Sequence, residues 1–149
     1  LLEIKKNGYV VIPDFFDKSQ CESCVNDMNF MFENNKEFIH QTDYSDARIF
    51  GAEYLSENIN SFAAHNLLKN LVVSSTDLKP MKSTSGHKHK GQEEVYFFIK
   101  GSGRMELDKQ EIDVNIGDAV LIEDGVFHRV HAGAEGCYFV CVFDGKRSH

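Results

Sequence analysis

The sequence predicts a mainly β fold, in which short antiparallel strands form a sandwich or barrel behind a helical N-terminal extension. After about residue 80, short alternating stretches follow one another at intervals of roughly eight to twelve residues, separated by turns rich in glycine and aspartate. Before that point, apolar residues recur at helical spacing instead. We therefore expect one structural unit with two parts, an α/β extension over residues 1–76 and a barrel core over residues 77–149.

The extension should contain two helices and two short strands. Residues 19–33 place apolar side chains at helical spacing on one face, and Ser19 to Glu22 has the form of a capping box. Cys21 and Cys24 lie on that face as a CxxC pair. We interpret the pair as core packing, because the chain has no second CxxC to complete a zinc site. The other expected elements are a strand at residues 8–12, a strand at 48–50 and a helix at 56–70.

Tight turns should join the strands of the barrel. The strand that begins at Glu94 is expected to end in the glycine turn 101–103, after which a second strand returns. Residues 95–99 and 137–143 are apolar on both faces, so the extension or a second subunit must cover their outer side. We expect the helices to cover one sheet and a homodimer to cover the other. The remaining expected strands are 104–107, 111–116 and 119–122, and Cys137 and Cys141 are expected to fill the barrel.

Composition argues against several classes of partner. The chain has a net charge of −7 and no extended basic cluster, so neither nucleic acid nor an anionic membrane surface is expected to bind. No apolar run approaches the ~20 residues of a membrane span, and the first residues lack the apolar segment of a signal peptide. The four cysteines agree with a reducing compartment. We expect a cytoplasmic protein.

Three histidines and a glutamate have the spacing of a metal site. His87 and His89 are two residues apart, which on a strand puts both side chains on one face, and Glu94 on the next strand can close on the same point. His128 follows a tight turn near Gly125. Three imidazoles and one carboxylate would leave one or two coordination positions open, which is typical of a catalytic metal rather than a structural one.

Periodicity chooses between the two adjacent glutamates. Side chains alternate between the faces of a strand, so only one of Glu93 and Glu94 can point inward. The resemblance of this segment to the first cupin motif, in which six residues separate the glutamate from a glycine, implies Glu94 because of its spacing to Gly101. Tyr96 and Phe98 then line the same interior, which makes Tyr96 a candidate catalytic residue beside Glu94.

These residues resemble the two sequence motifs of the cupin superfamily. In the first motif, His87, His89, Glu94 and Gly101 match the family pattern. In the second motif, Gly117, Gly125 and His128 match, whereas Glu123 stands where proline is usual and Ala132 where asparagine is usual. The resemblance covers about residues 75 to 145. It implies a jelly-roll barrel in which His87, His89, Glu94 and His128 bind one divalent ion, with Fe, Mn, Ni and Zn as candidates.

The N-terminal stretch resembles a second family. Residues 7–16, followed by a helix, look like the opening of phytanoyl-CoA-type dioxygenases, which use iron and 2-oxoglutarate on a related double-stranded β-helix. That family binds iron through a His-x-Asp motif, whereas this chain has His89 in place of the aspartate. The resemblance therefore implies the N-terminal topology of that family for this chain, but not the use of 2-oxoglutarate.

An open site of this kind predicts a small-molecule enzyme. Two mechanisms fit: Lewis-acid catalysis by an isomerase, epimerase or lyase, and O2 activation by an Fe(II) dioxygenase. Arg104 either points into the cavity to hold an anionic substrate, such as a carboxylate or a sugar phosphate, or forms a surface ion pair. A sensor or sugar-binding module that uses the metal to hold a ligand without catalysis is the alternative.

Overall fold

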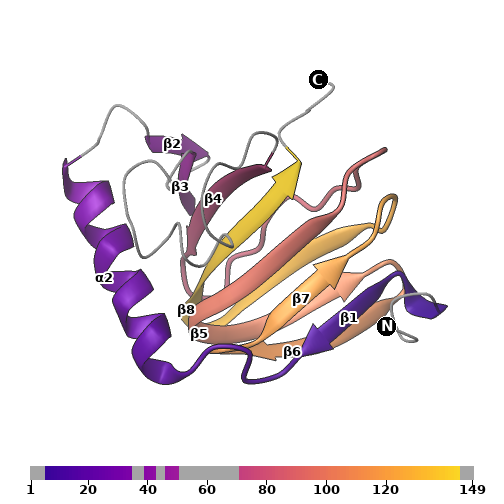
Figure 1. Cartoon of the computed structure of the whole chain (residues 1–149), viewed down its shortest axis with the longest axis horizontal. Coiled ribbons are helices and arrows are strands. Elements are labelled where there is room, and N and C mark those ends of the chain that lie inside the picture. Colours follow the sequence, from indigo (N-terminus) through magenta and orange to yellow (C-terminus); the bar gives the residue numbers. More distant parts are fainter. Residues whose placement is uncertain (1–5, 35–38, 43–45, 51–70, 145–149) are drawn as a thin grey trace.

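The computed structural model describes residues 6–34, 39–42, 46–50 and 71–144. Within these ranges the chain is mainly β, as predicted, with one long helix beside the sheets (Figure 1). No helix there is long and apolar enough to cross a membrane. The predicted helix at 56–70 lies outside the described residues. The elements are β1 (Tyr9–Ile12), α2 (Lys18–Asn34), β2 (Ile39–Thr42), β3 (Asp46–Phe50), β4 (Leu71–Leu78), β5 (Glu94–Leu107), β6 (Gln110–Asn115), β7 (Ala119–Ile122) and β8 (His128–Asp144).

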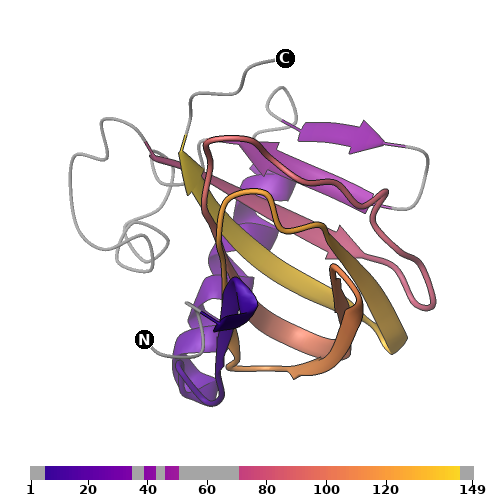
Figure 2. The same cartoon turned by 90° about the vertical axis from the view of Figure 1, so that its right-hand side faces the viewer.

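All of the strand pairs are antiparallel, in the order β1-β7-β5-β8-β4-β3-β2, with β6 pairing to β5. The first half of β5 pairs with β7 and with the end of β8, whereas its second half pairs with β6 and with the start of β8. The two longest strands therefore run through both sides of a barrel whose strands curve around a common interior (Figure 2). This is the predicted jelly-roll arrangement. The division at residues 76 and 77 stays a prediction.

The long ladder between β5 and β8 bends back on itself. The 14 residues of β5 would span about 43 Å as a flat strand. The ladder pairs Glu94 with the end of β8 and His128 with the end of β5, yet these two side chains approach to 3.5 Å. Register shifts between residues 98 and 103 mark the bend. The expectation that the strand ends at 101–103 is therefore wrong, because the glycines there bend a continuous strand instead of reversing it.

Glycine is required at the bend because two backbones approach closely there. A Cβ atom on Gly101 would stand 2.2 Å from the carbonyl oxygen of Gly136, and one on Gly103 would stand 2.3 Å from that of His131. Gly101 also has a φ of +74°, which disfavours other residues. The bend thus depends on the absence of side chains at these positions.

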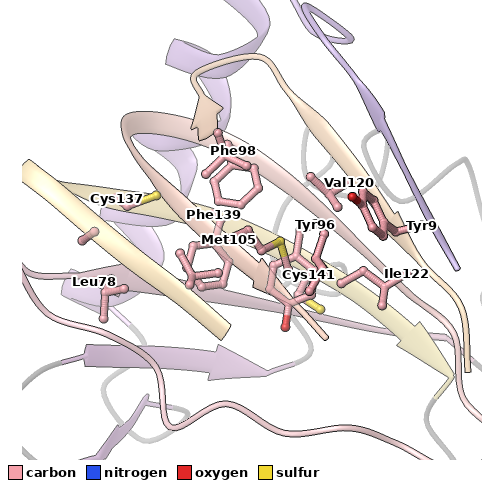
Figure 3. Packing of buried hydrophobic residues seen from close by; sticks show 14 of the residues in the cluster. Tyr9, Leu78, Tyr96, Phe98, Met105, Val120, Ile122, Cys137, Phe139 and Cys141 are labelled. Carbon is pink, nitrogen blue, oxygen red and sulfur yellow. The ribbon is translucent and has the colours of Figure 1, made fainter. Parts of the chain in front are cut away.

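Two apolar cores lie on the two sides of the sheet that contains β5. The first fills the barrel with inward-facing aromatic and aliphatic side chains, among them Tyr96, Phe98 and Phe139 (Figure 3). The second lies between the outer face of β5 and β8 and the helix α2, where Cys21, Cys24, Met28 and Met31 are buried. The first of the two helices expected to cover the barrel therefore does so, the second lies outside the described residues, and the CxxC pair belongs to this core. The homodimer stays a prediction.

The helix α2 begins with a capping box, but not the predicted one. The backbone N–H of Gln20 donates to Asp17 Oδ1 at 2.8 Å, and the N–H of Asp17 donates to Gln20 Oε1 at 2.9 Å. Asp17 is therefore the N-cap, two residues before the expected Ser19. The helix starts this early because the chain is tied to the barrel just before it, where the N–H of Phe16 donates to the carbonyl of Gly117 at 3.1 Å.

Substituting a bend glycine should destabilise the protein through the backbone clash. Gly91 has a φ of +79°, close to that of Gly101, but a Cβ atom there would have no neighbour within 4 Å. Gly91→Ala should therefore cost only the conformational penalty of about 1–2 kcal/mol. Gly101→Ala should cost at least ~1–3 kcal/mol more. Chemical denaturation of both variants measures the difference, and equal losses would show that the close approach does not matter.

Candidate metal centre

The four predicted ligands come from three places in the fold. Glu94 is the first residue of β5 and His128 the first residue of β8, whereas His87 and His89 precede β5. Two backbone hydrogen bonds at 2.8 and 3.0 Å join His87 to His128, and the N–H of Gly125 donates to the carbonyl of His89 at 3.0 Å. The histidine pair therefore lies in an irregular segment, fixed by the bridge between His87 and His128 and by the hydrogen bond to His89, not on the regular strand that the sequence suggested.

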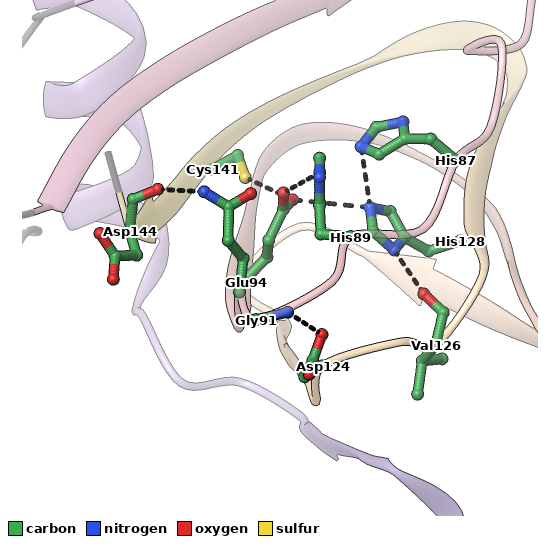
Figure 4. A network of polar contacts seen from close by, with 10 residues as sticks. His87, His89, Gly91, Glu94, Asp124, Val126, His128, Cys141 and Asp144 are labelled. Atoms are coloured by element: carbon green, nitrogen blue, oxygen red, sulfur yellow. Dashed lines mark hydrogen bonds and ion pairs between the residues drawn. The ribbon is translucent and has the colours of Figure 1, made fainter. Parts of the chain in front are cut away.

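The structure brings all four side chains together. One donor atom from each of His87, His89, Glu94 and His128 lies within 4.8 Å of the others (Figure 4). His89 Nε2 is 2.7 Å from Glu94 Oε1, and His128 Nε2 is 3.2 Å from His87 Nε2 and 3.5 Å from Glu94 Oε2. Adjacent donors around one first-row ion, at ~2.1 Å each, would stand about 3 Å apart. The observed separations fit that arrangement.

Two orphaned polar atoms show that the cluster suits a cation. Glu94 Oε1 and His89 Nε2 are both buried, and neither has a hydrogen-bond partner among the described residues. Their 2.7 Å separation does not have hydrogen-bond geometry. Burying such groups unsatisfied is costly. Two buried donor atoms that lie 2.7 Å apart and accept or donate no hydrogen bond among the described residues are what a divalent metal ion would satisfy, so the residues fit a metal.

The surroundings prepare His128 and Glu94 as ligands. His128 Nδ1 is 3.0 Å from the carbonyl oxygen of Val126, which can only accept, so Nδ1 carries a proton and Nε2 is the ring nitrogen directed at the cluster. Burial by itself would raise the pKa of Glu94. Hydrogen bonding and attraction from His128, assisted by Cys141 and His89, outweigh it and lower that pKa to about 2. The carboxylate is therefore ionised and ready to bind a cation at neutral pH.

The two other candidate catalytic residues have different positions. Tyr96 is buried inside the barrel, as periodicity predicts, with its ring centroid 5.6 Å from that of His128. Arg104 lies on the outer face of β5, and its Nη1 is 2.6 Å from Glu111 Oε2. Because Met105 is buried in the barrel, its neighbour Arg104 must point outward. Arg104 thus forms the surface ion pair and does not reach the cavity.

Sequence reasoning missed one residue beside the cluster and left one motif departure unexplained. Cys141 was expected only to fill the barrel, yet its thiol donates a hydrogen bond to Glu94 Oε2 at 3.2 Å. The alternation of β8 indicated an inward thiol but not its partner.

Glu123 stands in place of the usual proline, and its backbone N–H donates to the carbonyl of Gly8 at 2.7 Å. Proline has no N–H, so this contact with the N-terminal segment accounts for the departure.

Replacing Glu94 and Glu93 by glutamine, one at a time, should show which of these two residues binds the metal. Glu94→Gln removes the single negative charge of the donor set, so metal content measured by elemental analysis should fall to a small fraction of wild type. Glu93→Gln makes the same chemical change at an exposed position directly before β5 and should leave metal content unchanged. Similar metal content in both variants would contradict the assignment of Glu94.

Comparison with known proteins agrees with this geometry. A family model described as a cupin domain matches residues 75–143. An uncharacterized protein of Methanocaldococcus jannaschii is 36% identical over 44 residues, a match that spans 30% of this chain and only 35% of that protein.

Two solved structures share the fold. A cupin-2 domain from Rhodospirillum rubrum, 15% identical, aligns with a TM-score of 0.58 over 74% of this chain and 70% of its own. A prolyl-4-hydroxylase from Pseudomonas putida, 12% identical, aligns with a TM-score of 0.74 over 95% of both chains. At these identities the likeness concerns the fold alone. Residues 75–143, the part of the chain that the family model matches, therefore form a cupin domain, and the three-histidine, one-glutamate cluster lies within it.

Proposed function

We propose that the protein is a metal-dependent enzyme that acts on a small anionic molecule at the cluster of His87, His89, Glu94 and His128. The observation that carries this proposal is the pair of buried donor atoms, Glu94 Oε1 and His89 Nε2, that converge without a hydrogen-bond partner among the described residues. A divalent ion held there would supply Lewis-acid polarisation of a substrate oxygen or, as Fe(II), activation of O2.

The charge of the donor set favours an anionic substrate. Neutral imidazoles contribute no charge and Glu94 contributes one negative charge, so the centre would keep one net positive charge with a divalent ion. His87 and His89 are partly exposed, whereas Glu94 and His128 are buried. The open coordination positions should therefore face the side of the two partly exposed imidazoles, where a carboxylate or hydroxyl of the substrate can approach.

A cleft of about 600 Å³, which none of the four cluster residues lines, supports the same substrate class. It is lined by Lys6, Asn7, Tyr9, Leu107, Asp108, Lys109, Gln110 and Phe127, in which two lysines and one aspartate leave one net positive charge on an otherwise acidic protein. The hydroxyl of Tyr9 donates to Gln110 across this cleft. An anionic group near the lysines is the natural occupant.

Strand pairing relates this cleft to the metal ligands. Leu107 pairs directly with His128, and both side chains are buried. Tyr9 pairs with Ile122, which in turn pairs with Glu94, and these three side chains are also buried. Leu107 thus lies on the strand next to that of His128, about 5 Å away, and Tyr9 lies two strands from Glu94, about 10 Å away.

The interior chemistry favours oxygenation over isomerisation. Beside the cluster, the barrel is filled mainly with aromatic and aliphatic side chains, such as Tyr96, Phe98 and Phe139. Isomerases, epimerases and lyases need a positioned protein base. Glu94 and the three histidines belong to the donor set, so within the described barrel interior only tyrosine and cysteine side chains remain for that role. For oxygenation, the side chains need only bind the substrate and exclude water. An apolar interior excludes water well.

Reconstitution with single metals tests this proposal. We expect protein stripped by a chelator and reloaded with Fe(II) to consume O2 with members of a panel of small carboxylic and keto acids, and to respond less to the matching neutral amides. His89→Ala should lose this activity and Lys88→Ala, at the intervening position, should keep it.

The other outcomes each point to a different function. Turnover with Zn or Mn in the absence of O2 would favour the isomerase or lyase chemistry. Ligand binding that depends on the metal, without turnover under any loading, would support the non-catalytic sensor and contradict the enzyme.

A further inference from the structure

The thiol of Cys141 lies against the carboxylate of Glu94. Cys141 is on β8 directly opposite Tyr96 of β5, is only 6% exposed and belongs to the core inside the barrel. Its thiol donates a hydrogen bond to Glu94 Oε2 at 3.2 Å (Figure 4). The contact joins residues 47 positions apart in the sequence.

This contact makes the two oxygens of Glu94 unequal. Oε2 accepts from the Cys141 thiol and is 3.5 Å from His128 Nε2. Oε1 lies 2.7 Å from His89 Nε2 and has no hydrogen-bond partner among the described residues. One oxygen is therefore occupied by the protein, and the other is left for a cation.

A carboxylate needs such a contact to hold one orientation. The terminal torsion of a glutamate side chain is broad, so the two oxygens can rotate between positions unless a neighbour fixes one of them. A carboxylate can also bind a metal through one oxygen or through both. A donor on Oε2 restrains the rotation and competes for that oxygen, which favours binding through Oε1 alone.

We propose that Cys141 is a positioning residue that holds the Glu94 carboxylate so that only Oε1 is presented to the metal. This role rests on the proposed metal site. A thiol suits the position because it is a small, mostly apolar group with a weak donor, so it can complete the apolar wall beside Tyr96 and still contact the carboxylate. Partners of metal ligands typically contribute a factor of about 10 to 100 in metal affinity.

Cys137 provides a matched control on the same strand. It is also a buried cysteine of the barrel core, four residues earlier, and pairs with Leu78 of β4. Burial raises the pKa of its thiol to about 12, with a further contribution from Asp77. Replacing either cysteine by alanine removes one sulfur atom from the same core, so the two variants share the packing loss and differ in the contact with Glu94.

Co(II) binding to the full chain tests the role of Cys141. We expect Cys141→Ala to raise the Co(II) dissociation constant about tenfold or more, measured by competition with a chelator. It should also change the visible absorption of bound Co(II), because a carboxylate that binds through both oxygens alters the coordination number. Cys141→Ser retains a donor and should restore much of both properties, whereas Cys137→Ala should alter neither.

Each contrary result has a distinct meaning. If Cys141→Ala matches Cys137→Ala in both dissociation constant and spectrum, the positioning role is overturned while the metal site stands. If the wild-type protein itself binds no Co(II), the metal site and the positioning role fall together. Should Cys141→Ala fail to fold, the infrared S–H stretch decides. The S–H band of each thiol is identified as the band that is lost in its cysteine-to-serine variant. The Cys141 band should lie at lower frequency than the Cys137 band, and equal frequencies would overturn the proposal.

Discussion

The bend in the β5–β8 ladder is the constraint on which the rest of the structure depends. Glu94 and His128 each begin one of two long paired strands, so they start at opposite ends of the ladder. Only a ladder that folds back can bring their side chains to 3.5 Å. Gly101 and Gly103 permit this because no side chain fits between the two backbones there. A structural requirement far from the cluster thus produces the geometry of the cluster.

The site combines a buried negative charge with donors that cannot fully neutralise it. Glu94 is 4% exposed and ionised, and one ring nitrogen from each of three neighbouring imidazoles lies within 4.8 Å of its carboxylate. The protein satisfies Glu94 Oε2 with a thiol and leaves Oε1 unsatisfied. A site with this distribution of satisfied and unsatisfied atoms is prepared for a cation, since the ion would satisfy the donors that the protein does not.

The ligands were predictable from sequence because they belong to short motifs with local rules. The six-residue spacing to Gly101 favoured Glu94 over Glu93, and two-residue spacing paired His87 with His89, although these two histidines lie in an irregular segment before β5. Features that depend on contacts between distant strands were not predictable. The glycines at 101–103 looked like a turn because their role as a bend requires Gly136 and His131 on a partner strand. The outward direction of Arg104 and the contact of Cys141 with Glu94 depend on the same strand pairing.

X-ray absorption spectroscopy of the metal-loaded protein tests the central claim most directly, because it counts the atoms around the ion. The account predicts a first shell of nitrogen and oxygen at ~2.0–2.2 Å, with the outer-shell signature of three imidazoles. It also predicts no sulfur in that shell, because Cys141 contacts the carboxylate and is not itself a ligand. A shell with sulfur at ~2.3 Å, or with fewer than three imidazoles, would contradict the assignment of His87, His89, Glu94 and His128.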